Sequence, residues 1–302
     1  MSRSGAGDPR ELNSQNELLK KPSGHPELSH ERLAPSGSRA GPARSHSADL
    51  RDLDSQRTRF RERGRTYRLR TSEVEALSDI GRFRVIDVQE LSTARYQDDE
   101  LRMRRDLRNL AGQGLLETRI SRLNEGDREM VTLTKRGEEL LRATGAIRKD
   151  QKTYHGVGRP RDLDHDADLY RVYRRESAKI ERDGGRPSRV VLDFELKRDI
   201  YRGLPTVAAL PENERTREEI AQRHGLPVID GHIMVPDLRI EYETRDGDQA
   251  RVDLELVTSA YQTGHIAAKA SAGFSIYARS QDEGRVRRAL EDSRLIQEVF
   301  SI

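Results

Sequence analysis

Between residues 71 and 148 the hydrophobic positions recur with the spacing of amphipathic helices. TSEVEALSDIGRFRVI has an apolar side chain every three residues, and either Thr71 or Ser72 is suited to cap its start. DVQELSTARY follows with Asp87 as the expected cap, and DDELRMRRDLRNLAGQGLLE then predicts a third helix. The leucines of this third segment are expected to face a core: Leu101, Leu107, Leu110 and Leu115. A succession of short helices is therefore predicted.

After this third segment the helical spacing gives way to an alternation of apolar and polar residues. LLETRISRL and REMVTLT flank NEGD (124–127), which predicts two strands joined in a hairpin, and KRGEELLRATGAI predicts a closing helix. Helices followed by such a hairpin predict a winged helix-turn-helix DNA-binding domain over residues 71–148, with the third helix in the major groove. The candidate DNA-binding residues are the arginines of that helix: Arg102, Arg104, Arg105 and Arg108. The alternative is a protein-binding module whose arginines are only solvated.

The residues that precede this domain show no sustained periodicity. Ser, Gly, Pro, Arg and Asp dominate residues 1–56, which are predicted to form a disordered tail. Residues 57–70, RTRFRERGRTYRLR, predict an arginine-rich arm that contacts phosphates or the minor groove. Arg63 and Arg65 are its candidate DNA-binding residues. The alternative is a solvated linker, because charge runs are common.

The second half predicts a connector with a bridging helix over residues 149–187, followed by a second domain over residues 188–302. Its most informative segment is GHIMVPDLRIEYETRDGDQARVDLELVTSAY, which predicts two antiparallel strands joined by a tight turn at RDGD (245–248). Side chains alternate between the two faces of a strand, so Asp237 and Glu255 are expected on one face. Neighbouring carboxylates repel each other and are neutralised by a hard divalent cation. Asp237 and Glu255 are therefore candidate ligands for Mg²⁺, which could activate water against a phosphodiester.

These residues resemble the PD-(D/E)XK nuclease superfamily. Pro236 and Asp237 match its "PD", and Glu255 on the next strand matches its "(D/E)". Val257 stands where the superfamily has its lysine.

The resemblance implies that a lysine from the following helix takes that place. In TGHIAAKASAGFSIYA, His265 and Lys269 share one helical face, and Lys269 becomes the candidate. The resemblance also implies an acidic residue from the first core helix, a role that falls to Glu195 or Asp193. The candidate catalytic residues are thus Asp237, Glu255, Lys269 and Glu195.

The order of segments over roughly residues 70 to 280 is similar to that of the replication-relaxation family of plasmid and mobile-element proteins. The segments are the winged helix, RDLDHDADLYRVY, VPDLRIEYE, LELVT, and a helix with a lysine before FSIY. This resemblance implies a DNA-associated role in replication initiation, strand relaxation or transfer of an episome. The expected fold class is α+β, with an N-terminal winged helix-turn-helix followed by an αβ restriction-endonuclease-like domain.

Composition narrows the classes of function. Hydrophobic residues make up 33% of the chain and charged residues 35%, so part of the chain is expected to stay unpacked. A net charge of +3, carried mostly by arginine, favours nucleic acid as the partner. The absence of cysteine excludes disulfides, thiolate catalysis and cysteine-ligated zinc. The chain has neither a signal peptide nor an apolar run of about 18 residues, which predicts a cytoplasmic protein without membrane contact.

Two functions from different classes remain open. The first is a module that binds double-stranded DNA, as a monomer or a homodimer, with a nuclease-like domain that is non-catalytic or weakly active. The second is an endonuclease or nickase that requires Mg²⁺ and uses Asp237, Glu255 and Lys269. Each of these residues taken alone is more simply interpreted as a solvated surface residue. Their recurrence in order on successive elements favours a site.

Overall fold

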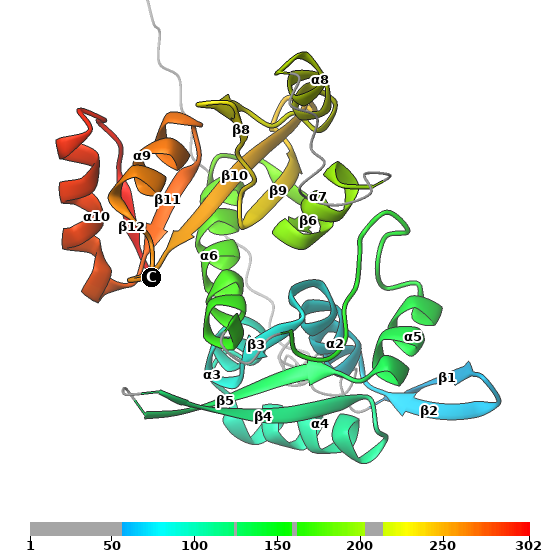
Figure 1. Ribbon diagram of the computed structural model, residues 1–302. Helices are drawn as coiled ribbons and strands as arrows, with labels where there is room; N and C mark the ends of the chain where they lie inside the picture. Colours follow the sequence, from blue (N-terminus) through cyan, green and yellow to red (C-terminus); the bar gives the residue numbers. More distant parts are fainter. Residues whose placement is uncertain (1–55, 124–125, 159–161, 203–213) are drawn as a thin grey trace, which may run out of the picture. The chain divides into compact units, whose positions relative to one another are not determined.

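A computed structural model describes residues 56–123, 126–158, 162–202 and 214–302, and these have a mixed α+β fold (Figure 1). The described residues belong to one compact unit. The predicted disordered tail lies outside them, apart from Gln56. None of the helices in this described part of the chain has the length and apolar character that a membrane crossing requires.

The segment expected to be an arginine-rich arm forms a β-hairpin instead. Strands β1 (Thr58–Glu62) and β2 (Arg65–Leu69) pair antiparallel around a turn at Arg63 and Gly64, which have positive φ angles of 47° and 77°. Positive φ at both central residues is the requirement of a type I′ turn, one of the two common two-residue hairpin turns. Tyr67 and Leu69 are buried, so one face of the hairpin packs on the core and orders the segment.

Helices and a short strand follow the hairpin. They are α2 (Thr71–Phe83), β3 (Val85–Asp87), α3 (Val88–Leu91), the π-helix η1 (Ser92–Tyr96) and α4 (Glu100–Gly112). The N-cap of α2 is Arg70, whose amide donates to the Glu73 side chain at 2.7 Å, rather than Thr71 or Ser72. The Ser72 hydroxyl instead donates to Asp106 on α4, at 2.6 Å. The predicted cap at Asp87 is confirmed, since its side chain accepts from the Gln89 and Glu90 amides.

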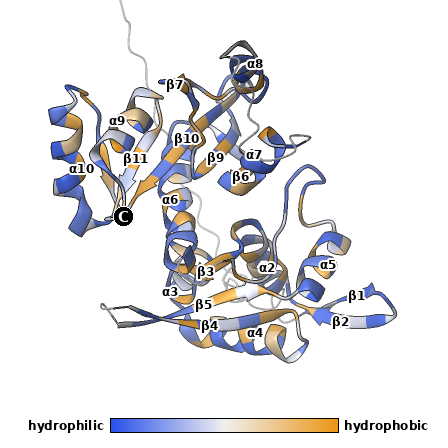
Figure 2. Ribbon diagram, viewed as in Figure 1, coloured by the Kyte–Doolittle hydropathy of each residue, from blue (hydrophilic) through white to orange (hydrophobic). Residues whose placement is uncertain are grey.

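The predicted hairpin after α4 is confirmed. Strands β4 (Leu116–Leu123) and β5 (Gly126–Leu133) pair antiparallel, and the sheet order is β3-β5-β4. Figure 2 shows β5 hydrophobic over its half next to α2 and hydrophilic toward the β4–β5 turn. Helix α5 (Lys135–Thr144) follows, capped by Thr134. Gly137 is required in its first turn, because a Cβ there would lie 1.9 Å from the Leu115 carbonyl oxygen.

The second half is built around a five-stranded sheet of order β12-β11-β10-β9-β6. In chain order, its elements are α6 (Leu163–Arg182), β6 (Arg186–Leu192), α7 (Asp193–Ile200), α8 (Glu214–His224), β7 (Val228–Ile229), β8 (His232–Ile233), β9 (Leu238–Glu243), β10 (Gln249–Val257), α9 (Thr263–Ser271), β11 (Ser275–Ala278), α10 (Ser280–Asp292) and β12 (Val299–Ser301). Strand β9 runs antiparallel to β6 and β10, whereas β11 runs parallel to β10 and β12. The turn predicted at 245–248 is confirmed. The strand expected from Ile233 starts only at Leu238, because Ile233 pairs in a separate small hairpin.

A buried carboxylate joins the helices of the first half to α6. Asp79 on α2 is 1% exposed and forms ion pairs with Arg82 and with Arg95 of η1. The Tyr170 hydroxyl of α6 donates to the same carboxylate at 2.9 Å. Burial alone would raise the pKa of Asp79, but the Arg95 and Arg82 guanidinium groups and the Tyr170 hydroxyl hold it below its usual value. One cluster of buried side chains continues on both sides of this contact, from Leu77 to Leu254.

We expect Asp79→Ala to lower the free energy of unfolding by about 3–5 kcal/mol, because it leaves buried cationic groups and a phenol without their acceptor. Urea denaturation measures the change. Asp292→Ala, at an exposed position at the end of α10, should shift it by no more than about 0.5 kcal/mol. Equal effects of the two substitutions would contradict the structural role of the Asp79 contacts.

Candidate functional site

Asp237 and Glu255 are cross-strand neighbours at the point where β9 begins. Leu238 pairs with Leu254, so the next positions outward are Asp237 and Glu255. The Asp237 amide donates to Glu255 Oε2 at 3.2 Å, and the Leu256 amide donates to Asp237 Oδ2 at 3.0 Å. The structure therefore brings together the two carboxylates that alternation placed on one face.

Lys269 completes this group from α9. Its Nζ lies 2.8 Å from Glu255 Oε1 and donates to the Val235 carbonyl at 2.7 Å. Val257 is fully buried in a hydrophobic cluster with Ile266, so its position in the sheet takes an apolar side chain. The ammonium reaches Glu255 from the helix instead, at the position where the sequence predicted it.

Sequence reasoning missed two groups that contact the carboxylates. His165, in the first turn of α6, places Nε2 at 3.3 Å from Asp237 Oδ2. The Tyr261 hydroxyl donates to Glu255 Oε1 at 2.8 Å. No local pattern marks either residue, because both reach the site through tertiary packing.

Helix α7 contributes a further ion pair beside the site. The Asp193 amide donates to the Asp237 carbonyl at 3.0 Å, and Lys197 Nζ donates to the Asp193 side chain at 2.6 Å. Burial alone would lower the pKa of Lys197, but Asp193, Asp237 and Glu255 raise it. The i,i+4 spacing of Asp193 and Lys197 was the signal available in the sequence.

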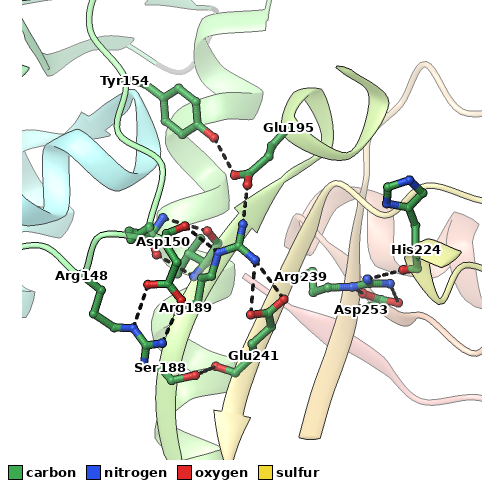
Figure 3. Close-up of polar contacts among 12 residues, drawn as sticks. Arg148, Asp150, Tyr154, Ser188, Arg189, Glu195, His224, Arg239, Glu241 and Asp253 are labelled. Carbon is green, nitrogen blue, oxygen red and sulfur yellow. Dashed lines mark hydrogen bonds and ion pairs between the residues drawn. The ribbon is translucent and has the colours of Figure 1, made fainter. Parts of the chain in front are cut away.

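Glu195 lies beside Tyr154 and Arg189 (Figure 3). Successive residues of a helix are about 100° apart, so Glu195 lies on nearly the opposite side of α7 from Asp193. There it accepts from the Tyr154 hydroxyl at 3.1 Å and pairs with Arg189. Burial raises its pKa against the opposing effect of Arg189. The side of α7 that approaches Asp237 carries Asp193 and Lys197, so the expected role of Glu195 at the site has no support from its contacts.

The two carboxyl groups have opposite pKa shifts. Burial and the adjacent Asp237 carboxylate raise the pKa of Glu255 to about 7, against the effect of Lys269. Burial would also raise the pKa of Asp237, but His165 and Lys269 hold it below its usual value. Burial alone would lower the pKa of His165, but Asp166 and Asp237 raise it to about 10. Near neutral pH Asp237 is therefore ionised next to a cationic imidazole, while Glu255 titrates beside the Lys269 ammonium.

An open cleft of about 660 Å³ borders this group. Its lining includes Lys197, Tyr201, Asp237, Tyr261, His265 and Lys269. Glu255 does not line the cleft and is fully buried. A ligand in the cleft would thus meet two carboxylates, Asp230 and Asp237, and two lysines, Lys197 and Lys269.

The donor set does not fit a Mg²⁺ ion shared by Asp237 and Glu255. Such an ion needs carboxylate oxygens that are open to it and to its water ligands. Glu255 Oε1 already accepts from Lys269 and Tyr261, and Glu255 Oε2 accepts from the Asp237 amide. Among the residues that the structure describes, no group of three or more Asp, Glu, His or Cys side chains is placed to hold a metal ion. Lys269 and His165 balance the charge that a cation would otherwise neutralise.

The four arginines expected to contact DNA lie differently on α4. The buried side of the helix carries Met103, Asp106, Leu107 and Leu110. Arg105 and Arg108 are exposed on the opposite side. Arg104 pairs with Glu100 and with Glu129 of β5, and the Arg102 guanidinium lies 5.8 Å from the Tyr96 ring centroid.

Leu101 differs from its expected orientation. It is 85% exposed, because it lies one and two turns before Arg105 and Arg108 on the outer side of α4. Met103 takes the inward position that the sequence assigned to Leu101. The outer side of α4 is therefore a stripe of Leu101, Arg105 and Arg108.

Arg63 and Arg65 line a pocket between the β1–β2 hairpin and α5. Arg63 forms an ion pair with Glu139 of α5 at 2.8 Å and lies 3.7 Å from Glu62. These two candidate residues thus face α5, where carboxylates accompany them.

Comparison with known proteins adds no family assignment. A scan against protein-family models, a search of curated proteins and a search of solved structures each found no match to this chain.

We expect the stability of wild type to fall relative to Glu255→Gln as the pH rises from about 4.5 to 7. The pKa of Glu255 rises from its usual 4.5 to about 7 on folding, so its stabilising contribution is complete below 4.5 and is lost as the pH passes 7. Gln cannot titrate, and groups unaffected by the substitution cancel in the difference. Urea denaturation of both proteins at pH 4.5 and pH 8 measures it. A difference that does not change with pH would contradict the raised pKa.

Proposed function

We propose that this chain is a double-stranded DNA-binding protein of the replication-relaxation type. The DNA-binding part is a winged helix-turn-helix made of α2, α3 with η1, α4 and the β3-β5-β4 sheet, with α4 as its recognition helix. The observation that carries the proposal is the stripe of Leu101, Arg105 and Arg108 on the outer side of α4. A helix of this kind fits the major groove of DNA.

The chemistry of the stripe supports base and phosphate contacts together. Arg105 and Arg108 can reach phosphates or the acceptor edge of guanine, and an exposed leucine can contact a thymine methyl group. The hairpin of β4 and β5 is joined to α4 through the Arg104–Glu129 ion pair, which supports its role as the wing.

The C-terminal half is proposed to be a nuclease-like domain that binds or scaffolds without cutting. Its carboxylates stand where the PD-(D/E)XK resemblance implies, on neighbouring strands with Lys269 arriving from the next helix. Their charges are already balanced by Lys269 and by a cationic His165. Glu255 is fully buried and does not line the cleft, so of these two carboxylates it is Asp237 that a ligand in the cleft would meet.

A second candidate function is cleavage of one DNA strand by this domain. The convergence of Asp237, Glu255 and Lys269, three residues from separate elements, favours it. In that case Lys197 and Lys269 would hold a phosphate in the cleft beside Asp237.

For the DNA-binding role, we expect Arg105→Gln/Arg108→Gln to weaken binding to duplex DNA and to reduce the slope of log K against log salt by about 2. Each phosphate contact contributes about 0.9 to that slope. Fluorescence anisotropy at salt concentrations from about 50 to 200 mM measures it. Arg287→Gln/Arg288→Gln removes the same charge from exposed positions of α10 and should leave the slope unchanged. Binding by wild type that does not depend on salt would contradict the proposal.

For the C-terminal domain, we expect no nicking of supercoiled plasmid that depends on Mg²⁺ or Mn²⁺. Wild type, Asp237→Ala and Glu255→Ala should then show the same background in a gel assay. Nicking by wild type that both substitutions abolish would establish the second candidate function, and would require Lys269 and His165 to release the carboxylates when the ion binds.

A further inference from the structure

The outer face of the β1–β2 hairpin carries a cluster of arginines. Phe60, Tyr67 and Leu69 turn toward the protein, and by alternation Arg59, Arg61 and Arg68 turn outward, where all three are exposed. Within the described ranges of the chain, no carboxylate pairs with any of these three arginines. Figure 2 shows both strands largely hydrophilic.

Two of these arginines are held directly opposite each other. Arg59 pairs with Arg68 in the strand register. The side chain of Gln113 accepts from the Arg68 amide at 3.2 Å and donates to the Arg68 carbonyl at 3.4 Å, so neither backbone group of Arg68 is bonded to Arg59. Such non-hydrogen-bonded pairs have Cα atoms only about 4.5 Å apart. Like charges facing each other there destabilise a hairpin, and a bound polyanion would relieve that cost.

This face continues the outer stripe of α4. Arg57 precedes β1 on the same side as Arg59 and donates to Asn109 Oδ1 of α4 at 3.4 Å. Asn109 follows Arg108 and lies one turn after Arg105. Figure 1 shows the hairpin at one end of α4 and the outer ends of β4 and β5 at the other. Gln113, just after the last residue of α4, secures the hairpin in that place.

We propose that β1–β2 is a second wing, whose Arg59, Arg61 and Arg68 bind backbone phosphates of duplex DNA beside the α4 site. This inference rests on the proposed DNA-binding function and assigns a second contact element to it. The aromatic side chains of the hairpin, Phe60 and Tyr67, point inward, so the outer face offers charge without a stacking surface. Single-stranded nucleic acid is bound by aromatic platforms as well as charge, whereas contacts to the backbone phosphates of a duplex need no stacking surface. The contact is therefore sequence-independent.

The test compares wild type with Arg59→Gln/Arg61→Gln/Arg68→Gln in the full chain, using a random-sequence duplex of about two helical turns. Three lost phosphate contacts should lower the slope of log K against log salt by about 3, and the affinity on the order of 100-fold at 0.1 M salt. The loss should be the same for duplexes of unrelated sequence. Arg182→Gln/Arg287→Gln/Arg288→Gln removes equal charge from exposed positions on α6 and α10 and should bind as wild type does.

A single reversal of charge separates binding from folding. Arg68→Glu sets opposite charges across the pair with Arg59, so it should raise or preserve the melting temperature of the free protein while weakening DNA binding. Normal binding by the triple variant, together with weakened binding by Arg105→Gln/Arg108→Gln, would overturn the second wing and leave the proposed function standing. Salt-independent binding by wild type would overturn both. A greater loss from Arg63→Gln/Arg65→Gln than from the triple variant would overturn the assignment of the outer face, and tighter binding of single strands than of duplex would overturn the choice of partner.

Discussion

The structure depends on a buried negative charge that several cationic and polar groups share. Asp79 is almost fully buried, yet it remains ionised because Arg82, Arg95 and Tyr170 surround it. Removing one partner from such a group costs far more than an exposed ion pair contributes, since a buried charge without compensation is left behind. The contact therefore requires one arrangement of these groups. It holds α2 and η1 against α6, and so it fixes the orientation of the first-half helices, including the side of α4 that is exposed.

Helix α6 extends that constraint into the second half. Two residues before Tyr170 it carries Asp168, which binds Arg128 of β5 and Arg279 next to α10. At its start it carries His165, which contacts Asp237. One helix therefore contacts Asp79, the strand of the predicted wing and the candidate site. A change in the packing of α6 would shift the contacts at all three places, because side chains on a single rigid helix move together.

The two candidate surfaces differ in how far opposite charges compensate each other. At the sheet, Lys269 and His165 balance Asp237 and Glu255, so the site is electrostatically complete as it stands. On the outer faces of α4 and the β1–β2 hairpin, exposed arginines adjoin one another, and Arg59 faces Arg68 directly. Clustered positive charge on a surface attracts a polyanion at long range, and salt screens that attraction. The proposed function follows from this contrast.

The sequence by itself determined the elements and the residues of the carboxylate group. The helical spacing around Leu77 and Ile80, the strand alternation and the turn at 245–248 are local. Asp237 and Glu255 follow from the strand alternation, whereas Lys269 was implied by the resemblance to the PD-(D/E)XK superfamily. Tertiary structure alone decided the rest. Leu101 turns outward because Met103 fits the core better in the phase that α4 adopts. The expected arm became a hairpin because Tyr67 and Leu69 found a surface to cover. Glu195 turned to Tyr154 and Arg189, whereas His165 reached Asp237 from α6. Contacts between residues distant in sequence leave no periodic trace along the chain, so only the folded structure shows them.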